Sequence, residues 1–168
     1  MSKVLIPGSF DPITLGHLDV IRRVAARFDW VYVAVMTNDM QRYVPGATGK
    51  TYMFTMEERR AMAALACSDL PNVEVVTSTG TLIALVDDLG VDWIIKGVRN
   101  EADFTYEQQH ALFNRAHNPR AETLYLPADP SLDGISSTAV REKLRAGEDV
   151  TQCLSASVIE WMKENKKI

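Results

Sequence analysis

The order of apolar and helical segments constrains the fold of this chain more than any other feature of its sequence. Short apolar runs, such as residues 30–36, are separated by longer segments whose apolar residues recur at helical spacing. A continuous apolar run is typical of a strand that is buried on both faces, as strands of parallel sheets are. The alternation therefore predicts an α/β fold, with helices on both faces of a five-stranded parallel sheet.

Each expected element has a defined place along the chain. The strands are predicted at residues 4–7, 30–36, 73–77, 92–96 and 123–126. The helices are predicted at residues 16–28, 55–67, 81–89, 102–117, 136–146 and 155–165. Thr55 and Glu58 form a capping box, and Gly90 and Gly147 mark two helix ends. This order is typical of a Rossmann-like, doubly wound sheet, which binds ligands at the carboxyl ends of its strands where the strand order reverses.

Length, composition and charge exclude several classes of protein. The 168 residues, 46% apolar and 24% charged, predict a single domain over residues 1–168 rather than a disordered tail, a collagen-like fibre or a disulfide-rich mini-protein. The net charge of −4 argues against general attraction to nucleic acid or to a membrane surface. Cys67 and Cys153 form no close pair, and no apolar run suits a signal peptide or a membrane span. We therefore expect a cytoplasmic protein.

The first predicted strand is followed by a turn that suits phosphate binding. Residues 7–17 read Pro-Gly-Ser-Phe-Asp-Pro-Ile-Thr-Leu-Gly-His, with two glycines and two prolines before the next helix. Ser9 supplies a hydroxyl, and His17 falls in the first helical turn, where backbone N–H groups are unpaired and the helix dipole is positive. Gly16 and His17 could merely shape the turn, but the whole string favours a phosphate site.

The fourth predicted strand ends in a basic segment. Lys96 and Arg99 flank Gly97 and Val98 at the expected reversal of strand order. Two cations around a glycine are suited to hold phosphate at this position, although the same residues elsewhere would be an ordinary solvated loop. Glu107 on the following helix fits a site residue and an exposed surface charge equally well.

The fifth predicted strand leads to a helix that starts with hydroxyl side chains, residues 135–138 (Ile-Ser-Ser-Thr). Such residues cap helices, and together with free backbone N–H groups they also bind polyphosphate. Three anion-receptive features after three different strands indicate a nucleotide site. No P-loop and no G-x-G-x-x-G motif follows a strand, which argues against a P-loop NTPase and a dehydrogenase. His110 and His117 share a helix face without a third ligand, so no protein metal site is expected.

Taken together, these motifs resemble a known family. Residues 8–12 (Gly-Ser-Phe-Asp-Pro) and 14–17 (Thr-Leu-Gly-His) are similar to the T/H-x-G-H signature of the nucleotidyltransferase superfamily. Segments 53–55, 57–59, 96–99 and 103–107 extend the resemblance to bacterial phosphopantetheine adenylyltransferases over nearly the whole chain. The resemblance implies in-line adenylyl transfer from ATP to 4′-phosphopantetheine, giving dephospho-coenzyme A and pyrophosphate in the penultimate step of coenzyme A biosynthesis. It also implies Mg²⁺ as cofactor, a homohexamer built as a dimer of trimers, and coenzyme A as a feedback inhibitor.

The same resemblance gives roles to individual residues. His17 would be catalytic through a hydrogen bond to the α-phosphate of ATP. The acceptor, 4′-phosphopantetheine, would be bound by Ser9, Lys50, Leu82 and Lys96. ATP would be bound by Ser9, Phe10, His17, Gly97, Val98, Arg99, Glu107, Leu132, Asp133, Gly134, Ile135, Ser136, Ser137 and Thr138.

The chain departs from the family pattern in ways that leave alternatives open. Ser9 stands for the usual threonine, and Lys96 for the arginine of some members, which keeps the charge but loses the guanidinium fork. Because the connection at residues 37–52 is long, Arg42 is an alternative to Lys50 as the cation that orients the phosphate of the acceptor. Thr138 replaces a serine, which makes the hydroxyl segment similar also to nicotinamide-mononucleotide adenylyltransferases. Nicotinamide mononucleotide is therefore the alternative acceptor, and a silent nucleotide- or coenzyme-A-binding module is the alternative outside enzymes.

Overall fold

The computed structural model describes residues 1–37 and 50–168, so Arg42 and most of the long connection lie outside the described residues. The strands are β1 (Lys3–Gly8), β2 (Trp30–Met36), β3 (Val73–Ser78), β4 (Trp93–Val98) and β5 (Thr123–Pro127). The helices are α1 (Leu15–Ala25), α2 (Met56–Ala66), α3 (Leu82–Leu89), α4 (Glu101–His117), α5 (Ser137–Ala146) and α6 (Ala156–Glu164). Every predicted strand and helix is confirmed, with ends that shift by at most about three residues. A short 3₁₀ helix at Pro130–Leu132 was not predicted.

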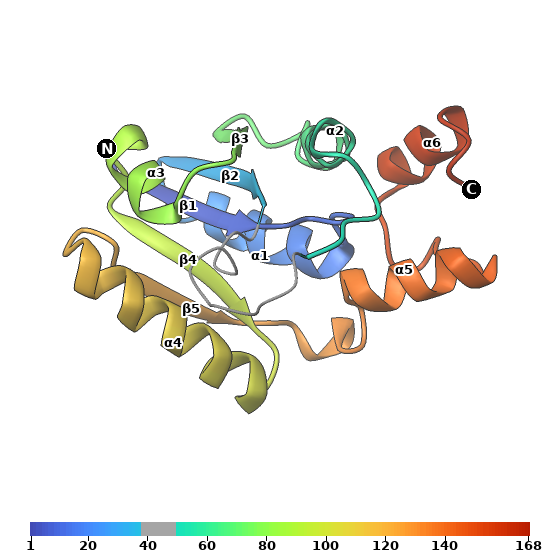
Figure 1. The fold of residues 1–168 in the computed structure, drawn as a ribbon. Helices are drawn as coiled ribbons and strands as arrows, with labels where there is room; N and C mark the ends of the chain where they lie inside the picture. Colours follow the sequence, from blue (N-terminus) through green and yellow to red (C-terminus); the bar gives the residue numbers. More distant parts are fainter. Residues whose placement is uncertain (38–49) are drawn as a thin grey trace.

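The five strands form one parallel sheet in the order β3-β2-β1-β4-β5 (Figure 1). The chain proceeds outward from β1 through β2 to β3, and then crosses back to place β4 on the other side of β1. β1 therefore pairs with both β2 and β4, and the strand order reverses between β1 and β4. The doubly wound sheet is confirmed, and its crevice for ligands lies where β1 and β4 end.

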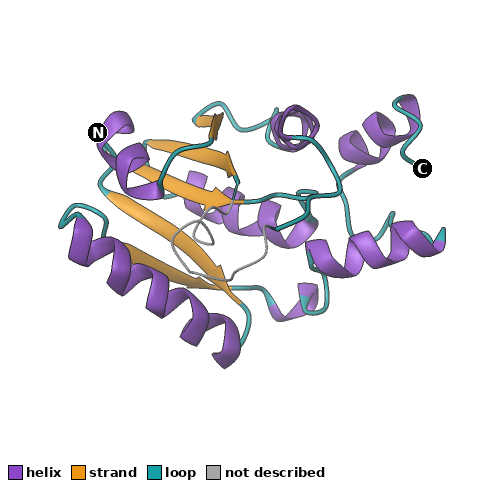
Figure 2. Cartoon of the chain, in the orientation of Figure 1, coloured by secondary structure: helices purple, strands orange, loops and turns teal. Residues whose placement is uncertain are grey.

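Helices cover both faces of the sheet, as Figure 2 shows. Alternate residues of β1 supply the two cores: Val4 and Ile6 join the cluster with α1, α2, α5 and α6, whereas Leu5 joins the cluster with α3. On the same side as α3, α4 packs along β5 through an edge-on contact of Phe104 with Tyr125, whose ring centroids are 5.1 Å apart. Because both faces are covered, β1 and β2 are apolar with little alternation, whereas the edge strands β3 and β5 are only partly buried.

The helix ends follow the local signals in the sequence. The hydroxyl of Thr55 accepts the backbone N–H of Glu58, and the Glu58 carboxylate accepts the backbone N–H of Thr55, which confirms the capping box. Gly90 and Gly147 end α3 and α5 with φ angles of 60° and 69°. Within the described parts of the chain, no helix is both long and apolar enough to cross a bilayer.

Gly97 allows β4 to approach α1 closely beside the crevice. A Cβ at this position would lie 3.0 Å from Cγ2 of Val20, which is buried in α1. A contact this short requires the Val20 side chain, or the helix or strand, to shift by a few tenths of an ångström. The glycine therefore sets the spacing between two elements that carry site residues.

We expect Gly97→Ala to lower the free energy of unfolding by about 1–3 kcal/mol, the usual cost of overpacking. Val20→Ala, which removes the two methyl groups, should recover part of that loss in the double variant. Urea unfolding of the two single variants and the double variant measures the coupling. Purely additive losses would show that the Cβ–Val20 contact is not the cause.

Candidate active site

One cavity of about 950 Å³ opens at the carboxyl ends of β1 and β4. The turn after β1, the starts of α1, α3 and α5, and one face of α4 form its walls. The volume is at the upper end of the range usual for small-molecule sites, which suits two ligands bound side by side.

Most residues that the sequence predicts for the site line this cavity. They are Ser9, Phe10, His17, Lys50, Leu82, Lys96, Gly97, Arg99, Glu107, Leu132, Ile135, Ser136, Ser137 and Thr138. Val98, Asp133 and Gly134 are not among the lining residues. The Val98 carbonyl accepts the backbone N–H of Ala128, and the Asp133 carboxylate accepts the N–H of Gly134, so these residues shape the segment after β5 and its neighbours.

His17 has its two ring nitrogens in different environments. Nδ1 lies 3.0 Å from the backbone nitrogen of Thr14, whose N–H donates to it, and 3.2 Å from the Thr14 hydroxyl. A backbone N–H can only donate, so Nδ1 is an acceptor and the neutral ring carries its proton on Nε2. Phe10 packs edge-on against the imidazole, with ring centroids 5.0 Å apart. The helix cap thus fixes the tautomer that presents an N–H donor at Nε2.

The environment also keeps this imidazole neutral. Burial, followed by the positive charge of Arg99, lowers the pKa of His17 to about 4. Protonation of Nδ1 would place a second N–H against that of Thr14. The side chain is therefore a neutral hydrogen-bond donor at physiological pH, not a cation.

Lys50 reaches the cavity from the far end of the long connection. Its ammonium donates to the Ser9 hydroxyl at 3.0 Å, so the two residues predicted to share a phosphate are in contact. Burial lowers the pKa of Lys50, and the charge of Arg141 adds to this effect. Two cations that repel each other in one cavity are suited to an anionic ligand.

Lys96 faces an acidic partner within the cavity. Its ammonium lies 3.2 Å from Oε2 of Glu107, but the alignment makes this a charge contact, because Oε2 has no hydrogen-bond partner among the described residues. Glu107 thus contacts the cation that the sequence assigns to the acceptor phosphate. Tyr125 pairs in register with Lys96, and burial together with the Glu107 charge raises the pKa of its hydroxyl.

Arg99 is held by the first turn of α4. Its Nε donates to Oδ2 of Asp103 at 2.8 Å, and its Nη2 approaches Oδ1 at 3.3 Å. Asn100 caps the same helix by accepting the backbone N–H of Asp103. The carboxylate orients the guanidinium at the cavity wall and partly balances its charge.

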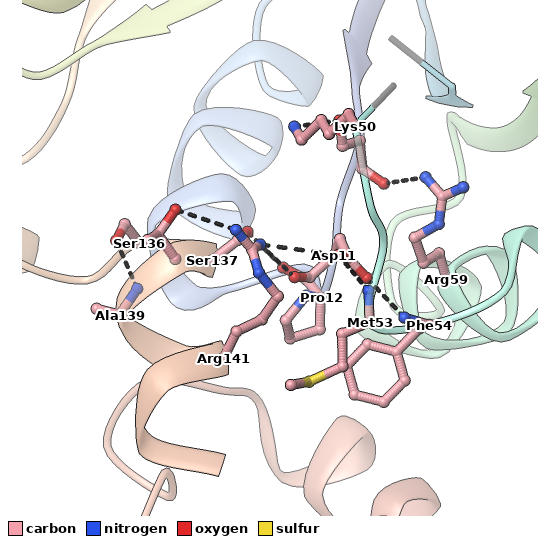
Figure 3. A network of polar contacts seen from close by, with 12 residues as sticks. Asp11, Pro12, Lys50, Met53, Phe54, Arg59, Ser136, Ser137, Ala139 and Arg141 are labelled. Atoms are coloured by element: carbon pink, nitrogen blue, oxygen red, sulfur yellow. Dashed lines mark hydrogen bonds and ion pairs between the residues drawn. The ribbon is translucent and has the colours of Figure 1, made fainter. Parts of the chain in front are cut away.

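The hydroxyl residues at the start of α5 have separate roles (Figure 3). Ser136 caps the helix by accepting the N–H of Ala139, and Ser137 donates to the carbonyl of Pro12 at 2.8 Å. Thr138 accepts from Nη2 of Arg141 at 3.1 Å. The backbone N–H groups of Ser137 and Thr138, in the first turn, have no intrahelical acceptor, and both residues line the cavity, where such groups can bind an anion.

Three charged residues of the site region were missed by the sequence predictions. Arg141 lines the cavity one turn after Thr138, so its helical spacing was an available signal. Asp11 was part of the quoted motif, but its role depends on contacts distant in sequence: its carboxylate accepts the N–H groups of Met53 and Phe54, both at 2.9 Å. Arg59 had two signals, because it lies in segment 57–59 of the family resemblance and its helical spacing from Met62, Ala63 and Ala66 places it on the buried face of α2.

The donor set of the cavity suits phosphate and not a metal held by the protein. Within residues 1–37 and 50–168, no group of three or more His, Cys, Asp or Glu side chains is placed to hold a metal ion. His110 is partly exposed and His117 is exposed, and both line the cavity, a position that the sequence did not predict.

Comparisons with known proteins agree with this geometry. The sequence matches the cytidylyltransferase-like family over residues 5–143. The phosphopantetheine adenylyltransferase of Limosilactobacillus reuteri (strain DSM 20016) is 40% identical over 164 residues, which cover 98% of this chain and 90% of the relative. That of Staphylococcus carnosus (strain TM300) is 39% identical over 163 residues, covering 97% and 96%. A solved structure of a proposed nicotinate-nucleotide adenylyltransferase from Vibrio parahaemolyticus has a TM-score of 0.71 at 20% identity, covering 99% of this chain and 95% of that one, and shows the shared fold.

The low pKa of His17 makes stability depend on pH. As pH falls below the ordinary histidine pKa of about 6.5, the unfolded chain binds a proton that the folded chain refuses until about pH 4. We expect the free energy of unfolding to fall by about 2 kcal/mol between pH 7.5 and pH 5 from this group. His17→Gln keeps a capping acceptor without a titrating ring, so it should lose correspondingly less. Urea unfolding of the wild-type and His17→Gln proteins at pH 7.5 and pH 5 tests this expectation. Equal losses of unfolding free energy in the two proteins would contradict the low pKa of His17.

Proposed function

This chain belongs to the cytidylyltransferase-like family and, within it, to the phosphopantetheine adenylyltransferases, and from this we propose that it transfers the adenylyl group of ATP to 4′-phosphopantetheine. The products are dephospho-coenzyme A and pyrophosphate. The relatives identify the acceptor, and the cavity supplies groups suited to the chemistry. The observation that carries most weight in the geometry is a neutral histidine donor in a cavity that Lys50, Lys96, Arg99 and Arg141 also line.

The reaction is a direct displacement at the α-phosphorus of ATP. A phosphate oxygen of 4′-phosphopantetheine forms the new P–O bond, and the bond from the α-phosphorus to the oxygen that bridges to the β-phosphorus breaks. Pyrophosphate leaves with that electron pair. No residue of this chain needs to form a covalent intermediate, so catalysis comes from positioning and from charge stabilisation.

His17 is suited to act on the reacting phosphoryl group. Its Nε2–H is preorganised because Thr14 occupies Nδ1, and its ring is neutral, so it donates without changing its own charge. A hydrogen bond to a non-bridging α-phosphate oxygen strengthens as negative charge builds there in the transition state. The imidazole thus fits the catalytic role that the sequence assigns to it.

Two groups of side chains divide the cavity between the substrates. Ser9, Lys50 and Lys96 would hold the phosphate of the acceptor, with Leu82 along its apolar chain. Glu107 would orient Lys96 before the phosphate arrives, because their charges are 3.2 Å apart. This contact refines the role of Glu107, which the sequence placed beside ATP.

The triphosphate side would be formed by the start of α5 and the segment after β4. The free N–H groups of α5, the hydroxyls of Ser136 and Thr138, and the guanidinium of Arg99 converge there. Arg141 joins this group, since it lines the cavity and contacts Thr138. Phe10, Gly97, Leu132 and Ile135 supply further wall around the nucleotide.

Magnesium is proposed as the companion of the nucleotide. The carboxylates Asp103 and Glu107 are engaged by Arg99 and Lys96, and no cluster of three or more metal ligands occurs in the described ranges. We therefore propose that Mg²⁺ is held mainly by the phosphates of ATP, which are ligands that this ion favours.

Assembly, regulation and location extend the same proposal. Large apolar side chains are exposed on α4 and on the strands beside it, among them Leu112, Leu124 and Trp93, which supports a homohexamer with subunit contacts at such surfaces. Coenzyme A contains both substrate moieties, so it would compete for the cavity as a feedback inhibitor. The cytoplasm fits a chain whose two cysteines are buried free thiols.

The first test is product formation with ATP, Mg²⁺ and a panel of acceptors, detected by mass. We expect dephospho-coenzyme A and pyrophosphate from 4′-phosphopantetheine. Nicotinamide mononucleotide, run in parallel, should give no dinucleotide. A dinucleotide alone would assign the alternative acceptor, and bound ATP without either product would indicate a binding module.

The second test concerns His17. His17→Ala should lower kcat by roughly 10²–10³, the usual cost of one preorganised donor, while the Kd for ATP changes little. Lys163→Ala on the exposed side of α6 is the control and should keep the wild-type rate. Near-normal turnover of His17→Ala would remove the imidazole from the mechanism.

A further inference from the structure

Arg59 carries a charge in the interior of the protein. It belongs to α2, and only 2% of its surface is exposed, whereas its neighbour Arg60 is exposed. Removing a guanidinium from water is costly unless hydrogen bonds and stacking compensate. A buried arginine of this kind therefore marks a place where the fold depends on its specific contacts.

The contacts of Arg59 join three segments that are distant in sequence. Nη1 donates to the carbonyl of Ser9 at 2.7 Å and to the carbonyl of Met36 at 3.1 Å. The guanidinium carbon lies 4.2 Å from the ring centroid of Tyr52, a stacking distance. One side chain thus contacts the turn after β1, the end of β2 and the segment that leads into α2.

Two of these segments carry the acceptor-side groups. The Ser9 carbonyl accepts from Arg59, while the Ser9 hydroxyl accepts from Lys50 at 3.0 Å. Tyr52, on which Arg59 stacks, follows Lys50 by two residues. Figure 3 shows Arg59 reaching from α2 toward this segment. Arg59 itself is not among the residues that line the cavity, so it can act on the reaction only through others.

We infer that Arg59 is a positioning residue for the acceptor phosphate, fixing Ser9 and Lys50 relative to each other from behind the cavity wall. The inference rests on the proposed function, in which these two residues bind 4′-phosphopantetheine. The guanidinium is suited to this task, because its plane stacks on an aromatic ring while its edge donates to carbonyls. A lysine ammonium keeps the charge and one donor group but has no plane to stack.

A double-mutant cycle between Arg59 and Lys50 tests this role. Arg59→Lys should lower kcat/KM for 4′-phosphopantetheine by roughly 10-fold in the wild-type chain, but by less than about 3-fold when Lys50→Met is already present. The KM for ATP should change by less than about 3-fold in each variant, because the contacts of Arg59 described above reach Ser9, Met36 and Tyr52 rather than α5 or Arg99. Arg60→Lys, one residue along the same helix, is the matched control and should leave all constants unchanged.

A purely structural role predicts a different pattern. Equal losses of kcat/KM in the two Lys50 backgrounds, or losses that affect ATP and the acceptor alike and follow the drop in Tm, would overturn the inference. If Arg59→Lys does not fold, Tyr52→Leu and Tyr52→Phe repeat the test, since only the first removes the ring. Equal acceptor kinetics in these two variants would also contradict it. No dephospho-coenzyme A from the unaltered chain would instead contradict the proposed function.

Discussion

The buried carboxylate of Asp11 holds together the parts of the chain that form the site. It accepts the backbone N–H groups of Met53 and Phe54, and Oδ2 lies 3.8 Å from Nη1 of Arg141. The same arginine nitrogen donates to the Asp11 carbonyl at 2.8 Å. A carboxylate with 1% exposure is stable only with such partners, so the turn after β1 is tied to the segment before α2 and to α5. The positions of Ser9, Lys50 and Thr138 all depend on this junction.

The cations of the cavity are placed so that the negative charge of a bound phosphate would balance them. Lys96 and Arg99 have acidic partners on α4, which hold the cations in place when no substrate phosphate is near. Lys50 donates to the Ser9 hydroxyl, and Arg141 donates to the Asp11 carbonyl while its guanidinium lies 3.8 Å from the buried Asp11 carboxylate. Against these cations His17 stays neutral, because burial and Arg99 both disfavour its protonation. The site therefore contains two kinds of group: fixed cations, which bind the phosphates, and a neutral hydrogen-bond donor, which can respond to negative charge that develops on the reacting phosphoryl group.

Much of the fold and of the site was predictable because the signals are local. The strand at residues 30–36 was predicted at its observed limits, since a continuous apolar run of that length between polar segments allows few alternatives. The phosphate-binding candidates were found because each follows a strand, and parallel strands end at one edge of the sheet. Arg59 shows where such reasoning stops. Its spacing from Met62 and Ala66 predicts that it is buried, but only the folded structure brings its guanidinium to the carbonyls of Ser9 and Met36.

The sequence by itself determined the α/β class, the helix caps and the chemical types of the groups that gather in the cavity, because periodicity, capping and turn residues act over a few positions. Tertiary structure decided how those groups are paired. The contact of Glu107 with Lys96 and the support of Ser9 by Arg59 depend on how separate elements pack together, and Arg59 and Ser9 are 50 residues apart in the chain. Such distances are set by the packing of the whole sheet and its helices, so no local pattern records them.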